Sequence, residues 1–263
     1  MDVQQNLLNK IFINSMGFAM ILSAATLLIL SMDGWRPNIQ GNDFTVALIA
    51  LEAVFSLMIL TTLGKTGASK FVLMIIGTVF TLWLATTYVL LSQGFYTATG
   101  VPQLAFALGV TIPVVIGYLA KQLWQPLTKA VDAMSTKSFL LLQFMRAAFG
   151  IMFFFTAALP VWFQYTGGLG DIAAGFGAFL GLYCLYKNPN NERQAIIRGN
   201  LIGILDFIVV LSLGLIVVLS DHSPDIMFSL IPLYVVPLFI LLHIFSLQRL
   251  SKINQKNNSE IID

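Results

Sequence analysis

Long, mostly apolar runs with few charged residues alternate with short polar stretches along the chain. Each run has about the 20 residues that a helix needs to cross the hydrocarbon core of a bilayer. None shows the period-two alternation of a barrel strand, and a backbone exposed to lipid must satisfy its own hydrogen bonds. We therefore predict an all-α polytopic bundle of about eight transmembrane helices. Their approximate limits are 11–32, 44–63, 71–92, 104–123, 138–160, 168–186, 200–219 and 226–247.

Turn-forming residues separate the runs. The longest polar link, 124–137, divides the predicted spans into four plus four. We predict one integral membrane domain over 1–263, with 1–123 and 138–250 as candidate halves of a duplicated unit. The predicted breaks are Asp33–Asn38, Gly64–Gly67, Thr99–Pro102, Tyr165–Gly168, Lys187–Asn191 and Asp221–Pro224.

Composition supports a membrane protein and removes several functional classes. Only 10% of the 263 residues are charged and 57% are hydrophobic, whereas soluble proteins carry roughly 25% charged residues. The net charge is only +2, and the basic residues are scattered through short loops rather than clustered in a patch. We therefore expect no nucleic-acid partner. The chain has one cysteine and none of the phosphate-loop, zinc-hydrolase or serine-elbow motifs. We assign no cofactor, no metal ligand and no catalytic residue, and an enzyme is the less favoured class.

The basic residues predict the orientation. With the N-terminus inside, Arg36 in an outer loop and Arg146 within a span are the exceptions among 14 Lys and Arg residues. All the others then fall on the cytoplasmic side, as the positive-inside rule requires. We expect a multi-pass cell-membrane protein with both termini in the cytoplasm and the lipid bilayer as its main partner.

Ionisable groups inside the apolar runs are the candidate functional residues, because each costs roughly 2.5–3.5 kcal/mol at the centre of a helix. The helical rise places Arg146, Asp206 and His243 in the cytoplasmic half, where they could meet. Glu52 is expected near the middle of the membrane, and Asp171 near the outer end of its span as a separate feature. The candidates for binding a substrate or ion are Glu52, Gln143, Arg146, Asp171, Asn200, Asp206 and His243.

These residues allow structural and functional interpretations. Arg146 and Asp206 could form a buried ion pair that fixes the register of two helices. Alternatively, Asp206 or Glu52 exchanges a proton or binds a cation while Arg146 anchors an anion. Glu52 could also be neutral and hydrogen-bonded to a neighbouring helix, and His243 could be an interfacial or hydrogen-bonding residue.

Small residues predict where helices approach closely. Gly170, Ala174, Gly177 and Gly181 share one face of the span at 168–186. Gly203 and Asp206 share a stripe on the next span, and Gln143 and Arg146 share a face of the span at 138–160. We expect these three faces to contact one another. The predicted packing glycines are Gly170, Gly177, Gly181 and Gly203.

Residues 138–250 carry a series of spaced motifs. They are Leu142-Gln143-x-x-Arg146-x-x-x-Gly150, Leu159-Pro160-x-x-Phe163, Gly168-x-Gly170-Asp171-x-x-x-Gly175, Asn200-x-x-Gly203-x-x-Asp206 and Pro232-x-x-x-x-Pro237-x-x-x-x-x-His243. This pattern resembles an uncharacterised family of bacterial multi-pass membrane proteins with about eight helices. The resemblance implies bacterial origin and an inner-membrane location, and it brings no activity.

Three functional hypotheses follow. The favoured one is a transporter or channel for an unidentified small molecule or ion, with proton coupling as an option. The second is an intramembrane enzyme that acts on a lipid through Asp206, His243 and Arg146. The third is an assembly or sensor protein whose polar residues only hold helices together. A homo-oligomer is compatible with each hypothesis.

Overall fold

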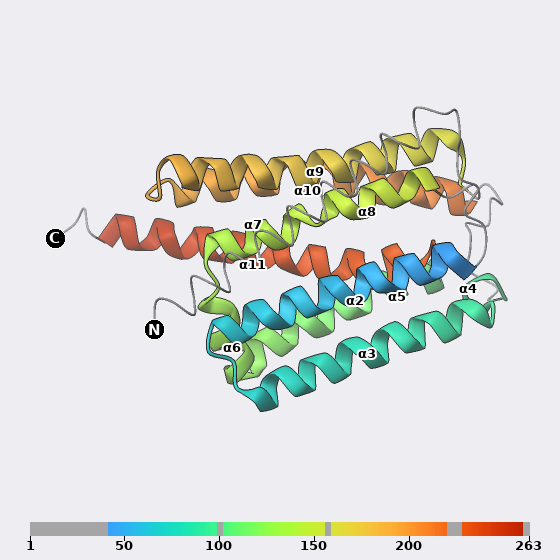
Figure 1. Cartoon of the computed structure of the whole chain (residues 1–263), viewed down its shortest axis with the longest axis horizontal. Helices are drawn as coiled ribbons and strands as arrows, with labels where there is room; N and C mark the ends of the chain where they lie inside the picture. Colours follow the sequence, from blue (N-terminus) through green and yellow to red (C-terminus); the bar gives the residue numbers. More distant parts are fainter. Residues whose placement is uncertain (1–41, 99–101, 156–158, 220–227, 260–263) are drawn as a thin grey trace. The chain divides into compact units, whose positions relative to one another are not determined.

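A computed structural model describes residues 42–98, 102–155, 159–219 and 228–259 of the chain. All of them belong to the compact unit Gln40–Asp263. Every regular element in these ranges is a helix (Figure 1). The first predicted span, 11–32, lies outside the described residues.

Seven of the described helical segments are long and apolar enough to cross a membrane. The prediction of long apolar helices is therefore confirmed for the second to eighth spans. The helices are α2 (Asn42–Lys65), α3 (Lys70–Ser92), α4 (Phe95–Ala98), α5 (Pro102–Leu123), α6 (Gln125–Asp132), α7 (Thr136–Phe144), α8 (Arg146–Met152), α9 (Val161–Lys187), α10 (Glu192–Leu219) and α11 (Val236–Ser259). A 3-10 turn (Phe153–Phe155) follows α8, and a π-helical turn (Ile231–Val235) precedes α11.

Local sequence explains several helix ends. Gly67 adopts a positive φ of 91°, which ordinary side chains disfavour, between α2 and α3. Ser69 then caps α3, and its hydroxyl accepts the Val72 N–H at 3.3 Å. Ser135 caps α7 in the same way by accepting the Ser138 N–H at 3.1 Å. These capping bonds satisfy amides that the first turn of a helix leaves without partners.

One predicted break between spans is wrong. The predicted break at 165–168 lies inside α9, which begins at Val161 directly after Pro160. Gly167 and Gly168 are buried there against neighbouring helices, and in a membrane such glycines serve packing rather than chain reversal. The polar link 124–137 contains the short helix α6.

The α7–α8 segment and α11 lie between the α9–α10 pair and the helices α2, α3 and α5 (Figure 1). The helix α9 packs against α7, α8 and α10, whereas α11 contacts α5, α7 and α10. Outward-facing side chains of α3 and α5 are mostly apolar, such as Phe71, Leu82 and Ile116. An exposed apolar surface of this extent suits lipid rather than water.

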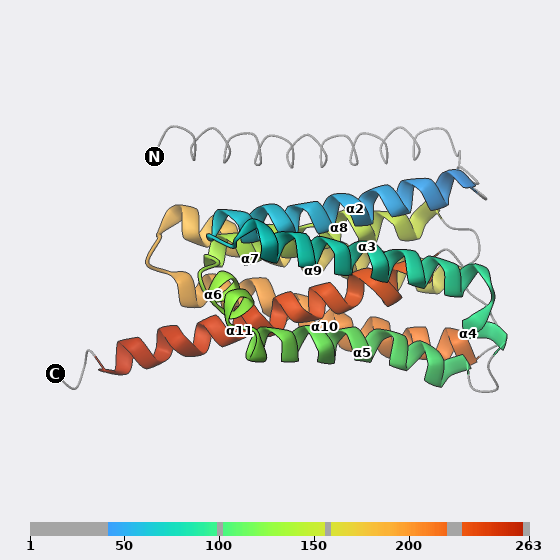
Figure 2. The same cartoon turned by 90° about the horizontal axis from the view of Figure 1, so that it is seen from below.

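The two ends of this unit differ in charge. We call the basic end the one where α6, the α9–α10 turn and the C-terminal half of α11 lie (Figure 2). Outside the span interiors, the lysines and arginines of the described residues lie near this end, for example Lys65, Lys70, Lys187 and Arg193. The other end contains α4 and the first turns of α9.

Prolines explain the π-helical turn. Pro237 has no N–H, so the carbonyl four residues earlier, at Leu233, receives no helical hydrogen bond from it. Pro232 lies within the same turn. The helix accommodates the interruption with the wider π geometry, which occurs often at functional sites.

Candidate functional site

Arg146 lies at the centre of a buried ionic cluster. Its side chain is 1% exposed, and Nε and Nη2 donate to Asp171 Oδ1 at 2.8 and 2.5 Å. The same Nη2 also pairs with Asp206, and Nη1 donates to the Gly203 carbonyl at 2.8 Å. One guanidinium from α8 therefore joins carboxylates from α9 and α10, which we call the ionic cluster.

The expectation that Asp171 forms a separate outer feature is wrong. It was drawn from a span starting at 168, whereas α9 starts at Val161. Asp171 is ten residues into this helix, so it lies about 15 Å from the first residue of α9. At that depth it reaches Arg146 directly. The sequence placed Arg146 and Asp206 together, and the structure brings them into contact.

Glycines make this approach possible. A Cβ on Gly170 would collide with the Asp206 carboxylate. A Cβ on Gly203 would lie 2.7 Å from His243 Nε2 and 3.2 Å from Arg146 Nη1. Helix packing around the cluster thus depends on the missing side chains of these two residues.

The other predicted packing glycines also lie at helix contacts. A Cβ on Gly181 would lie 2.7 Å from the Ala195 carbonyl, and one on Gly177 would lie 3.2 Å from Ile202 Cδ1. Gly150 approaches the Gly168 carbonyl, where an added Cβ would be 2.6 Å away. The three small-residue faces do contact one another, as the sequence predicts.

A second polar group lies beside the cluster. Asn200 Nδ2 donates to Ser246 Oγ at 2.9 Å and to the Ile196 carbonyl at 2.7 Å. Its Oδ1 lies 2.8 Å from His243 Nδ1 and accepts from Gln143 Nε2 at 3.2 Å. Because Oδ1 is an acceptor, Nδ1 of His243 donates this bond, and Nε2 has no hydrogen-bond partner among the described residues. His243 is therefore a buried hydrogen-bonding residue and not an interfacial one.

Glu52 stays apart from these two groups. Its side chain is 0% exposed, and neither carboxylate oxygen has a hydrogen-bond partner among the described residues. The proposed bond to a neighbouring helix is therefore not formed within that part of the chain. One turn along α2, Ser56 shares a hydrogen bond of 2.7 Å with Tyr234 on the π-helical turn.

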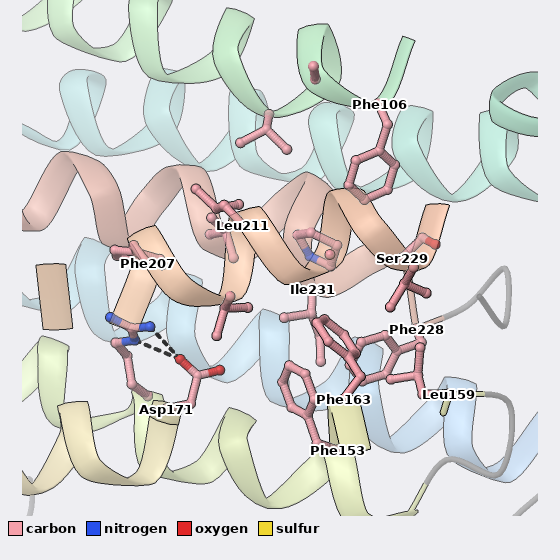
Figure 3. A pocket seen from close by; sticks show the side chains of 18 of the residues that line it. Phe106, Phe153, Leu159, Phe163, Asp171, Phe207, Leu211, Phe228, Ser229 and Ile231 are labelled. Carbon is pink, nitrogen blue, oxygen red and sulfur yellow. Dashed lines mark hydrogen bonds and ion pairs between the residues drawn. The ribbon is translucent and has the colours of Figure 1, made fainter. Parts of the chain in front are cut away.

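A cavity of about 290 Å³ extends from the ionic cluster toward the end opposite the basic one. Asp171 and Phe207 lie at one end of it, and Leu159, Phe228 and Ser229 lie at the other (Figure 3). Arg146 and Asp171 are the charged residues of its lining. The rest is mostly apolar and comes from α5, α9, α10, the 3-10 turn, the π-helical turn and the residues next to them. The cavity is thus amphipathic, with charge confined to one end.

Sequence reasoning missed several residues of this region. The Phe207 ring centroid lies 3.8 Å from Arg146 Cζ, which is a cation–π contact on the residue after Asp206. Ser246 follows His243 by three residues, so helical spacing could have identified it. The phenylalanines of the cavity carry no such signal, because apolar residues are common on every face of a lipid-facing helix.

At the basic end, Asp132 of α6 connects three segments. It accepts from Lys252 at 2.6 Å and pairs with Lys121 at 3.2 Å. Burial raises the pKa of Asp132, but the hydrogen bonds from Lys252 and Lys121 outweigh burial and hold the pKa below its usual value. Arg249 binds the Thr136 hydroxyl and the Met134 carbonyl at 2.9 and 3.0 Å. These contacts attach α6 to α5 and α11.

Comparison with known proteins identifies a family to which the chain is similar. The model of a domain of unknown function (DUF8737) matches residues 101–251, more than half of the chain. The chain belongs to the DUF8737 family. This match agrees with the expected membership of an uncharacterised family, and it includes the ionic cluster, the Asn200–His243 group and the cavity. Neither the curated proteins nor the solved structures contain a match to the chain.

Proposed function

We propose that this DUF8737 protein is a membrane carrier that couples the movement of a small solute to that of a proton. One observation supports it above all: the 290 Å³ cavity ends on Arg146 and Asp171. Cavities of this kind, apolar with a few polar groups at one point, are typical of small-molecule sites.

The charges of the ionic cluster supply a physical reason why the movement of a solute would be coupled to that of a proton. One guanidinium faces two carboxylates, so the fully ionised cluster carries a single excess negative charge. An unbalanced buried charge is costly, and a bound proton or a bound cation removes it. A site that holds one or the other exchanges them, and that exchange is the basis of proton coupling.

The distribution of basic residues supports a particular orientation in the membrane. With the basic end in the cytoplasm, the positive-inside rule is satisfied and α11 ends on the cytoplasmic side. A first span at 11–32, as the sequence predicts, would put the N-terminus on that side too. The cavity then lies in the half of the membrane that faces away from the cytoplasm. The resemblance to bacterial proteins favours the bacterial inner membrane.

An intramembrane enzyme is a weaker alternative. Arg146, Asp206 and His243 are buried close together, as that hypothesis requires. However, both carboxylates are engaged with Arg146. The lining hydroxyl of Ser229 lies at the far end of the cavity from Asp171 (Figure 3). A reacting group held by the cluster would therefore not meet that hydroxyl.

Proton flux in proteoliposomes tests the proposal. Vesicles containing the purified protein and the pH dye pyranine are given a pH gradient. A panel of amines, amino acids, organic acids and neutral amphiphiles is then added outside. We expect at least one solute to drive proton movement with the wild-type protein, and Asp206→Asn to abolish that response.

Asp132→Asn is the matched control, since it makes the same chemical change outside the spans. It should retain the solute response. Absence of any solute-dependent flux across the panel would refute the carrier, as would an Asp206→Asn response equal to that of the wild type.

A further inference from the structure

We propose that the cavity binds a small organic cation with an apolar body, in preference to an anion or a neutral molecule. The site is the one that the carrier proposal uses, and the inference rests on that proposal for its biological meaning. Binding itself can be measured independently of transport.

Four of the five N–H donors of Arg146 are already engaged. Nε and Nη2 are engaged by Asp171, Nη2 also by Asp206, and Nη1 by the Gly203 carbonyl. An anionic solute would meet a guanidinium that two carboxylates already over-neutralise. Repulsion from those carboxylates makes anion binding unfavourable.

Asp171 presents negative charge to the cavity. Its Oδ1 receives both hydrogen bonds from Arg146. The other carboxylate oxygen points away from that bond, toward the side of the cavity where Phe153 and Phe163 lie (Figure 3). A cationic group placed there would contact the carboxylate and supply the charge that balances the cluster.

Aromatic rings form much of the remaining wall. The cavity is lined by five phenylalanines, which are Phe106, Phe153, Phe163, Phe207 and Phe228. The face of an aromatic ring attracts cations, and sites that bind quaternary ammonium groups use several rings together. Phe207 already binds a cation in this way, since it lies against the guanidinium of Arg146.

The volume limits the size of the solute. About 290 Å³ is at the lower end of the range of small-molecule sites, and it equals roughly ten water volumes. One aromatic ring with a trimethylammonium group is a suitable probe. Thr111 and Ser229 add only two hydroxyls, so a strongly polar body would lose more hydration than it regains.

Three probes of nearly the same shape separate charge from size. They are benzyltrimethylammonium, its neutral isostere neopentylbenzene and the anion phenylmethanesulfonate. Binding to the full-length protein in nanodiscs is measured by equilibrium dialysis. We expect the cation to bind at least about tenfold more tightly than either of the other probes.

Variants locate the binding site. Asp171→Asn should weaken cation binding by about tenfold or more while leaving the weak binding of neopentylbenzene unchanged. Phe163→Leu removes a lining ring without touching the ionic cluster and should weaken cation binding by several-fold. Phe176→Leu changes an exposed ring on the same helix and should have no effect.

Equal binding of the three probes, preference for the anion or failure of the cation to bind would overturn the inference. So would cation binding that Asp171→Asn and Phe163→Leu leave unchanged. The carrier proposal fails separately. Proton-coupled flux of an acid without cation binding would refute the cation site alone, and cation binding without proton flux would refute the carrier alone.

Discussion

The helices α3 and α5 are about as apolar as α9 and α10, yet the two pairs occupy different environments. Most side chains of α3 and α5 face outward, whereas α9 and α10 pack closely and contribute two buried carboxylates. Lipid is as apolar as leucine, so hydrophobicity does not decide which helices associate. Small residues and buried polar groups decide it, and in this chain they are concentrated in α8 to α11.

Removing Arg146 should produce the largest difference in stability between changes in α8 to α11 and changes in α3 and α5. Arg146→Met leaves Asp171 and Asp206 buried without their cation, which should cost about 3–5 kcal/mol of stability. Unfolding by a denaturing detergent in mixed micelles measures it. Leu108→Ala on the exposed face of α5 should change stability far less, because the residue is 45% exposed and no charge loses its partner.

The triple variant Arg146→Met, Asp171→Asn, Asp206→Asn sharpens that test. It removes all the charges together, so most of the lost stability should return. A triple variant as unstable as Arg146→Met would show that packing of the guanidinium, and not charge balance, stabilises this region.

Glycine substitutions should have the next largest effect on the free energy of unfolding. They should destabilise the protein in α8 and stabilise it in α3. Gly150→Ala would place its Cβ 2.6 Å from the Gly168 carbonyl and 2.9 Å from the Ile172 nitrogen. Backbone atoms cannot move aside cheaply, so a loss of about 1–3 kcal/mol is expected. Gly77→Ala on α3 meets only Leu60 at an ordinary 3.4 Å and should gain up to about 1 kcal/mol from helix propensity. Equal effects in the same unfolding assay would contradict the comparison.

The ion pairs of Asp132 at the basic end should contribute least to the stability of the protein. A lowered folded pKa means that ionised Asp132 stabilises the protein above its ordinary pKa of 3.8, and that this contribution is lost as the pH falls through the folded value. Asp132→Asn should therefore cost up to about 1 kcal/mol at neutral pH, as is usual for partly exposed pairs. Thermal unfolding at pH 7 and pH 3 checks this, and a difference that persists undiminished at pH 3 would contradict it.

Glu52 and Asp171 illustrate what could be predicted about individual sites. Both were identified from the cost of charge in hydrocarbon, which needs only the position of a residue within an apolar run. The pairing of Asp171 with Arg146, and the lack of a hydrogen-bond partner for Glu52 among the described residues, could not be predicted in the same way. The error for Asp171 came from one helix boundary, because moving the start of α9 to Val161 changes the depth of every residue that follows.

The sequence by itself determined the described apolar helices, the end at which their basic residues gather and the residues that are costly inside the membrane. These properties depend on the free energy of transferring each segment from water to lipid, which is local along the chain. The tertiary structure decided that Asp171 and Asp206 share Arg146, that Asn200 orients His243, and that five phenylalanines border one cavity. Those contacts depend on the rotation and close approach of helices far apart in sequence, for which the apolar pattern holds no information.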